Sequence, residues 1–285
     1  MFEAPNEPQD FGKTLDTGFR LFGAGWKRGM LIILYMIVVL GVLAGILTAT
    51  FVPLLDDPSG PPGFLIGLAL VIAPLFLFAW TIFMNALTAF FGALYRGVDL
   101  HIGDALRVGL NKMFPVIGWY LLFLLMVFGA MLPGGIIIGI GIASQEPAII
   151  AMTMFFGFFV FAVPYFFVIV LFVFGPYLIV IENMGVMEAF AEAKRLVWGN
   201  WWRTFAYGIV VTLLVWIISM VISLPLGVAG FVMDLNGEVG GSLVLQVINN
   251  LLSLLVYPLS VAMTLSYMFD MMLRRSGSDL AARLA

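Results

Sequence analysis

Cysteine is absent from this 285-residue chain, and histidine occurs once, at His101. The lack of cysteine excludes disulfides, thiolate metal sites and a cysteine nucleophile. A single histidine leaves no histidine-based metal site, and neither a glycine-rich phosphate loop nor an H-E-x-x-H motif occurs. His101 is expected in a solvated connector. We therefore expect a protein that is not an enzyme and that needs no metal or other cofactor.

Charge is also scarce. Charged residues make up 10% of the chain and hydrophobic residues 63%, with a mean hydropathy of +1.13. Soluble domains carry about 25% charged residues, so this composition indicates a protein that crosses a membrane several times. The net charge of -3 gives no support for a nucleic-acid partner. Membrane lipids are the expected surroundings.

Six apolar segments are long enough to cross the hydrocarbon core as helices, which takes about 20 residues each. They are residues 30–55, 64–95, 114–143, 148–181, 204–232 and 242–273. We expect one all-α membrane domain over residues 11–285, preceded by a mobile polar tail at residues 1–10. Kinks are predicted at five of the prolines inside the spans, namely Pro74, Pro164, Pro176, Pro225 and Pro258.

Basic residues are missing from every second loop. All 13 lysines and arginines precede span one, lie between spans two and three or four and five, or follow span six. The opposite loops hold only acids, namely Asp56, Asp57, Glu146, Asp234 and Glu238. Basic residues near span ends resist translocation, so both termini are predicted to be cytoplasmic.

Three short amphipathic segments precede spans one, three and five. They share a charged residue (Lys13, Asp104, Glu188) followed five positions later by a small one (Gly18, Gly109, Ala193). This pattern predicts three cytoplasmic interfacial helices and a three-fold repeat of one such helix with a hairpin of spans. In the third segment the apolar stripe is Met187, Phe190, Val197, Trp198 and Trp201. Such a helix either lies on the membrane surface or caps the bundle.

Polar residues in the spans are the candidate ligand-binding residues. Asn85 shares a face of span two with Thr81 and Thr88, and Asn249 and Asn250 lie in the outer part of span six. Asp270 and Arg274, four residues apart near the cytoplasmic end of span six, have the spacing of a helical ion pair. Such groups either join helices by hydrogen bonds or line a ligand cavity.

Two segments carry a family resemblance. Gly175–Arg203 (GPYLIVIENMGVMEAFAEAKRLVWGNWWR) has an apolar end, a short turn and an alanine-rich helix, and Tyr267–Leu284 (YMFDMMLRRSGSDLAARL) has an aromatic-Asp pair, basic residues and Asp-Leu. On these the chain resembles uncharacterised bacterial inner-membrane proteins of the YciC type. It also resembles the related membrane domain of some glycerophosphodiester phosphodiesterases. The resemblance implies a six-span fold in a bacterial inner membrane and no established reaction. Met272 and Ser276 depart from the family pattern, so no C-terminal charge network is carried over.

Two functions fit these features. The first is a non-enzymatic scaffold or envelope-maintenance role, through the interfacial helices and lateral contacts with lipids, other membrane proteins or a second copy of the chain. The alternative is a transporter or flippase-like carrier of an apolar or amphipathic solute, because transporters use repeated hairpins and interrupted spans. An intramembrane enzyme acting through Asp270 or Glu182 is the third alternative.

Overall fold

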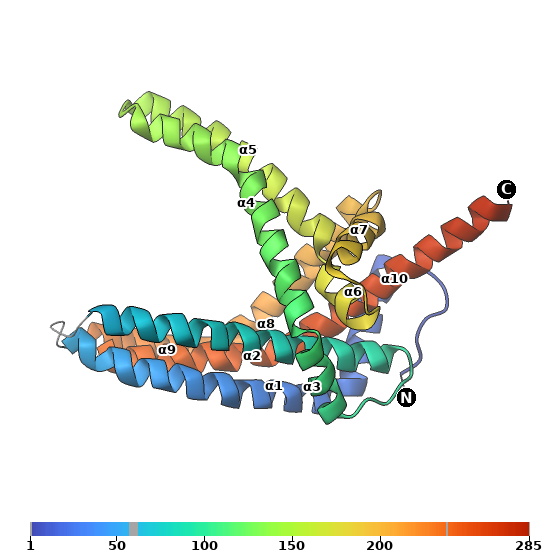
Figure 1. Cartoon of the computed structure of the whole chain (residues 1–285), viewed down its shortest axis with the longest axis horizontal. Helices are drawn as coiled ribbons and strands as arrows, with labels where there is room; N and C mark the ends of the chain where they lie inside the picture. Colours follow the sequence, from blue (N-terminus) through green and yellow to red (C-terminus); the bar gives the residue numbers. More distant parts are fainter. Residues whose placement is uncertain (1, 57–61, 238, 285) are drawn as a thin grey trace. The chain divides into compact units, whose positions relative to one another are not determined.

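A computed structural model describes residues 2–56, 62–237 and 239–284 (Figure 1). Within these ranges the structure contains helices and no strand, which confirms the all-α class. The elements are α1 (Phe11–Asp56), α2 (Pro62–Tyr95), α3 (Ile102–Asn111), α4 (Met113–Ala143), α5 (Pro147–Phe172), α6 (Gly175–Ile181), α7 (Val186–Val197), α8 (Trp201–Leu235), α9 (Val239–Ser253), the short 3₁₀ helix η1 (Leu254–Val256) and α10 (Tyr257–Leu284). Six stretches of the described residues are long and apolar enough to cross a membrane, as predicted.

Two of the six spans are broken. Span four consists of α5 and α6, which are separated at residues 173–174, directly before Pro176. Span six consists of α9 and α10, which are separated by η1, directly before Pro258. A proline inside a helix removes a backbone donor and clashes with the carbonyl four residues earlier, so the breaks fall where the sequence predicts kinks. Pro74, Pro164 and Pro225 lie inside helices that stay continuous.

The three predicted interfacial helices differ in how they join their spans. α3 and α7 are separate helices, each preceded by a turn with a left-handed residue, Gly97 (φ +74) and Asn183 (φ +57). The first segment is instead the start of α1, a helix of 46 residues that continues into span one. Residues 11–52 contain no proline, so nothing in this stretch stops the helix.

The chain divides into two compact units, residues 1–113 with 209–285 and residues 114–208. In the first unit α1 packs along α2, α9 and α10 (Figure 1). Glycines allow this close approach, because a Cβ on Gly18 would come within 3.0 Å of Met263 and Ser266, and one on Gly25 within 2.9 Å of Phe91. The core of this unit includes the fully buried side chains of Leu21, Ile32, Ile33, Met36, Leu87, Phe91, Met263, Leu265 and Tyr267.

The second unit is built on the antiparallel helices α4 and α5 (Figure 1). Gly134 of α4 lies directly against Phe161 of α5, so the glycine-rich run after Pro133 permits close packing. At the other end, α7 packs on α6 and α5. Phe190 of α7 lies between two rings, stacked on Trp119 (centroids 5.2 Å apart) and edge-on to Phe172 (5.2 Å). These rings hold α7 in a fixed place on the unit.

Many large apolar side chains of the spans are exposed. In the most apolar window of α8 only 6% of the residues are buried inside the protein. Water would make such a surface unstable, whereas lipid tails are as apolar as the side chains that touch them. The exposed surface of the spans therefore matches a hydrocarbon environment.

Candidate functional site

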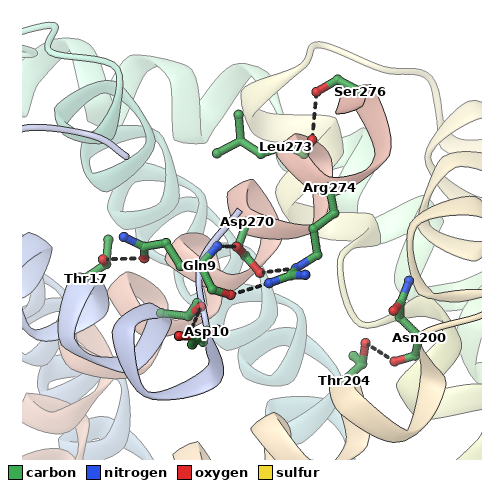
Figure 2. A network of polar contacts seen from close by, with 10 residues as sticks. Gln9, Asp10, Thr17, Asn200, Thr204, Asp270, Leu273, Arg274 and Ser276 are labelled. Atoms are coloured by element: carbon green, nitrogen blue, oxygen red, sulfur yellow. Dashed lines mark hydrogen bonds and ion pairs between the residues drawn. The ribbon is translucent and has the colours of Figure 1, made fainter. Parts of the chain in front are cut away.

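A polar cluster lies near the C-terminal end of the chain, on α10 (Figure 2). The Asp270 side chain is 3% exposed. Its Oδ2 accepts a hydrogen bond of 2.9 Å from Nε of Arg274, and its Oδ1 accepts one of 2.6 Å from the backbone N–H of Gln9. Arg274 also donates to the carbonyl of Gln9. The ion pair predicted from the four-residue spacing is thus confirmed. The backbone of Gln9 hydrogen-bonds to both of its members, through the N–H to Asp270 and through the carbonyl to Arg274.

The same cluster fixes the N-terminal segment. Thr17 of α1 donates a 2.7 Å hydrogen bond to Oε1 of Gln9. Near the start of the segment, Phe2 is buried, and its ring centroid lies 5.4 Å from that of Tyr95. Tyr95 in turn stacks on Phe269 of α10 at 4.1 Å. Composition predicts a mobile tail at residues 1–10; in the structure Phe2 and Gln9 contact the first unit, whereas most of the side chains between them are exposed. We call the contacts of Gln9 with Asp270, Arg274 and Thr17 the N-terminal latch.

The N-terminal latch is suited to anchoring the N-terminal segment on α10. Hydrogen bonds to a charged group contribute about 1.5–3 kcal/mol each when they are formed on folding. Both oxygens of Asp270 accept such bonds, and the carboxylate is almost completely shielded from solvent. This arrangement favours an anchoring role for Asp270 and Arg274 over ligand binding.

Asn85 takes part in a contact between helices. The residue is 3% exposed, and its Nδ2 donates to the carbonyl of Gly109 in α3 at 3.4 Å. Gly109 lies directly on the carbonyl of Ile82, with no room for a side chain. The small residue shared by the amphipathic segments is therefore the point where α3 meets α2. Of the two roles that the sequence leaves open for Asn85, the structure supports the interhelical hydrogen bond.

The two asparagines of α9 lie in different surroundings. Asn250 is exposed. Asn249 lines a cavity of about 320 Å³ with residues of α8 and α9, and its Oδ1 is buried without a hydrogen-bond partner in the part of the chain that the structure describes. Asn85 contacts α3 and Asn249 faces α8, so the structure does not bring the two predicted polar faces together.

One ion pair has no signature in the sequence. Arg28 of α1 donates to Asp99 in the α2–α3 connector, 71 positions away. This hydrogen bond holds the pKa of the Asp99 carboxyl below its usual range. Together with Trp26 and Lys27, the pair lines a cavity of about 450 Å³. His101 is exposed in the same connector.

The described residues contain no group of three or more histidine, cysteine or acidic side chains that could hold a metal ion. Of the acids in the loops without basic residues, Asp57 and Glu238 lie outside the described residues. The remaining acids of those loops are Asp56, Glu146 and Asp234.

Comparison with known proteins identifies a family. A family model described as a domain of unknown function, DUF7847, matches residues 11–267. The chain therefore belongs to the DUF7847 family, which agrees with the expected uncharacterised family and adds no link to YciC-type proteins or to glycerophosphodiester phosphodiesterases. No curated protein and no solved structure matches the chain.

Proposed function

We propose that this DUF7847-family protein is a non-enzymatic scaffold or envelope-maintenance protein of a bacterial inner membrane. Both termini are placed in the cytoplasm, because all 13 basic residues fall on one side of the predicted spans. The role is exerted through the interfacial helices and through lateral contacts with lipids, other membrane proteins or a second copy of the chain.

The observation that carries this proposal is the two-sided surface of α7. Its inner side is buried through Ala189, Phe190, Ala193, Leu196 and Val197. Outside, Met187 is 71% exposed and Trp198, the residue that follows the helix, is 61% exposed. Lys194 and Arg195 lie in the last turn, with the Lys194 ammonium 5.5 Å from the Trp198 ring centroid.

This surface has the chemistry of a membrane boundary. Tryptophan is enriched at the level of the lipid headgroups, and each Lys or Arg near an anionic leaflet contributes about 1 kcal/mol of attraction. The apolar stripe predicted from the sequence is divided between two uses: Phe190 and Val197 face the unit, whereas Met187 and Trp198 face outward. A helix fixed on one side and exposing apolar and basic groups on the other supports a docking surface for lipids or neighbouring membrane proteins.

Carriage of an apolar or amphipathic solute is the second candidate, and the cavity at Asn249 favours it. Two contacts weigh against a pathway between spans two and six. The rings of Trp80 and Tyr257 meet edge-on at 5.2 Å, and those of Tyr95 and Phe269 stack at 4.1 Å. These contacts are the reason that we propose the scaffold role first.

Complementation of a deletion strain tests the proposal. The double variant Met187→Glu, Trp198→Glu should reach the membrane at normal levels but lose both restoration of envelope integrity and lateral crosslinks. The matched control Met187→Leu, Trp198→Phe keeps the apolar surface and should complement. If the deletion instead causes loss of uptake of one solute, and the purified protein restores that flux in vesicles, the scaffold role is wrong and the carrier role is right.

A further inference from the structure

The cavity beside the Arg28–Asp99 ion pair lies between the first half of α1, the end of α2 and the connector to α3. Its volume is about 450 Å³, and its lining residues are Gly23, Ala24, Gly25, Trp26, Lys27, Arg28, Phe90, Leu94 and Asp99. All of them belong to the first compact unit. The two helices meet closely at Gly25, where a Cβ would come within 2.7 Å of the Leu94 side chain. The cavity is therefore bounded by helices that are in direct contact.

The basic residues of this lining mark a membrane boundary. Lys27 and Arg28 are the last charged residues before residues 29–55, which carry no charge. On the neighbouring span, residues 58–95 carry no charge, and Arg96 is the first charged residue after them. Lysine, arginine and tryptophan next to such runs lie at the level of the lipid headgroups. The cavity, which also contains the exposed ring of Trp26, is thus at headgroup depth.

The basic side chains of the cavity have hydrogen-bond donors to spare. Arg28 gives one Nη N–H to Asp99, and a guanidinium has five N–H donors. Lys27 forms no ion pair with a described acid, and its ammonium lies 5.9 Å from the centroid of the Trp26 ring. Two cations against one carboxylate leave the lining with a net charge of +1. These features suit an anion with several acceptor oxygens, such as a phosphate group.

An exposed apolar strip continues from the cavity into the span. Leu31, Leu34 and Val38 follow Lys27 by four, seven and eleven positions, so they lie on the same face of α1. Their exposed fractions are 43%, 47% and 64%. A hydrocarbon chain attached to the anion would lie along this strip, whereas a free phosphate ion would leave it unused. The cavity and the strip together match a headgroup and its acyl chains.

We infer that this cavity binds the phosphate headgroup of an anionic phospholipid, with Lys27 and Arg28 donating to the phosphate oxygens and the acyl chains along Leu31, Leu34 and Val38. A zwitterionic headgroup carries a second, positive group that these two cations repel, so it binds more weakly. The site goes beyond the proposed scaffold role and does not depend on it, since α7 contributes none of its residues.

Native mass spectrometry of the purified full chain in detergent micelles tests the inference. The probes are phosphatidylglycerol and phosphatidylcholine with the same acyl chains. The first molecule of phosphatidylglycerol should bind at least about fivefold more tightly than the first molecule of phosphatidylcholine. Inorganic phosphate at the same concentration as the lipid should not displace it, because the free ion makes no contact with the apolar strip.

Three variants locate the binding. Lys27→Gln should lower the affinity for phosphatidylglycerol about fivefold and leave that for phosphatidylcholine unchanged. Asp99→Asn removes the opposing charge and should raise the affinity for phosphatidylglycerol. Gly23→Leu fills the cavity at a position where a Cβ meets no atom within 4 Å, and it should weaken binding. The matched controls on the same helix are Lys13→Gln, at an exposed lysine, and Gly12→Leu, where a Cβ also meets no atom within 4 Å; both should leave binding unchanged.

Three outcomes would overturn the inference. They are equal binding of the two lipids, equal losses in Lys27→Gln and Lys13→Gln, and displacement of the lipid by an equal concentration of inorganic phosphate. Equal losses would mean that the lipid senses only the overall charge of the protein. Should Gly23→Leu fail to fold, the two lysine variants decide instead, because both side chains are exposed and their replacement leaves the helix packing as it is.

Discussion

The two halves of span six differ in whether their buried polar groups have hydrogen-bond partners. In α10, the hydroxyl of Ser266 donates to the carbonyls of Thr14 and Met263, and both oxygens of Asp270 accept hydrogen bonds. In α9, on the other side of η1, the Oδ1 of Asn249 is buried without a hydrogen-bond partner among the described residues. Where water is scarce, a satisfied polar group stabilises the fold, and an unsatisfied one costs stability.

The largest expected effect on stability comes from removing the hydrogen bonds of Asp270 in α10. Replacing Asp270 with leucine leaves Arg274 and the N–H of Gln9 without their acceptor and should lower the free energy of unfolding by about 3 kcal/mol. Titration with SDS in mixed micelles measures this change. The control Glu192→Ala removes a more exposed ion pair, with Arg195 at 3.4 Å, and should cost no more than about 1 kcal/mol. Equal losses in the two variants would show that the latch is not an anchor.

A pair of glycine variants tests close packing in the same unit. Gly109→Ala forces α3 away from α2 and strains the Asn85 hydrogen bond, so it should destabilise the protein by about 1–3 kcal/mol. Gly103→Ala lies on the same helix, where a Cβ meets no atom within 4 Å. It should be neutral or stabilise by up to about 1 kcal/mol, because alanine is the better helix former. The same unfolding titration compares them, and a loss at Gly103 as large as at Gly109 would contradict the packing argument.

For the unsatisfied acceptor of Asn249 in α9, we expect a change in stability of the opposite sign. Asn249→Leu removes a buried acceptor without removing a hydrogen bond to it, so stability should stay the same or rise by about 1 kcal/mol. Thermal unfolding followed by tryptophan fluorescence measures this difference. A loss like that of Asp270→Leu would mean that Asn249 is already satisfied, and the contrast between the halves would disappear.

The smallest effect is the pH dependence of the Arg28–Asp99 pair. Because the hydrogen bond from Arg28 lowers the pKa of Asp99 in the folded state, the contribution of the pair is complete above the ordinary carboxyl pKa of about 3.9. It is lost as the pH falls through the lower, folded-state pKa. The melting temperature of the parent protein should therefore fall slightly more than that of Asp99→Asn between pH 5 and pH 3. Parallel curves would exclude any contribution from this pair.

Sequence patterns locate the spans well because hydropathy and proline act locally. The six apolar segments, the separate helices α3 and α7, and the breaks near Pro176 and Pro258 all depend on neighbouring residues. The Asp270–Arg274 ion pair is local in the same sense, since its two members are one helical turn apart.

Contacts between distant residues are not visible in such patterns. The latch joins Gln9 to Asp270, 261 positions away, through a backbone N–H that every residue except proline possesses. Composition therefore predicts a mobile tail and cannot show the contacts that Gln9 and Phe2 make in the structure. The same limit applies to Asn85 and Asn249, since their faces are predictable but their neighbours depend on which helix packs there.

We propose that the two ends of the span-five/span-six hairpin face opposite sides of the membrane, with the latch in the cytoplasm and the α8–α9 turn outside. Since the chain has no cysteine, Ser276→Cys, near the latch, and Asn236→Cys, in the α8–α9 turn, each carry a single thiol, and both positions are exposed. A membrane-impermeant maleimide applied to intact cells should label Asn236→Cys at once and Ser276→Cys only after permeabilisation. Labelling of Ser276→Cys in intact cells, or protection of Asn236→Cys, would contradict the arrangement.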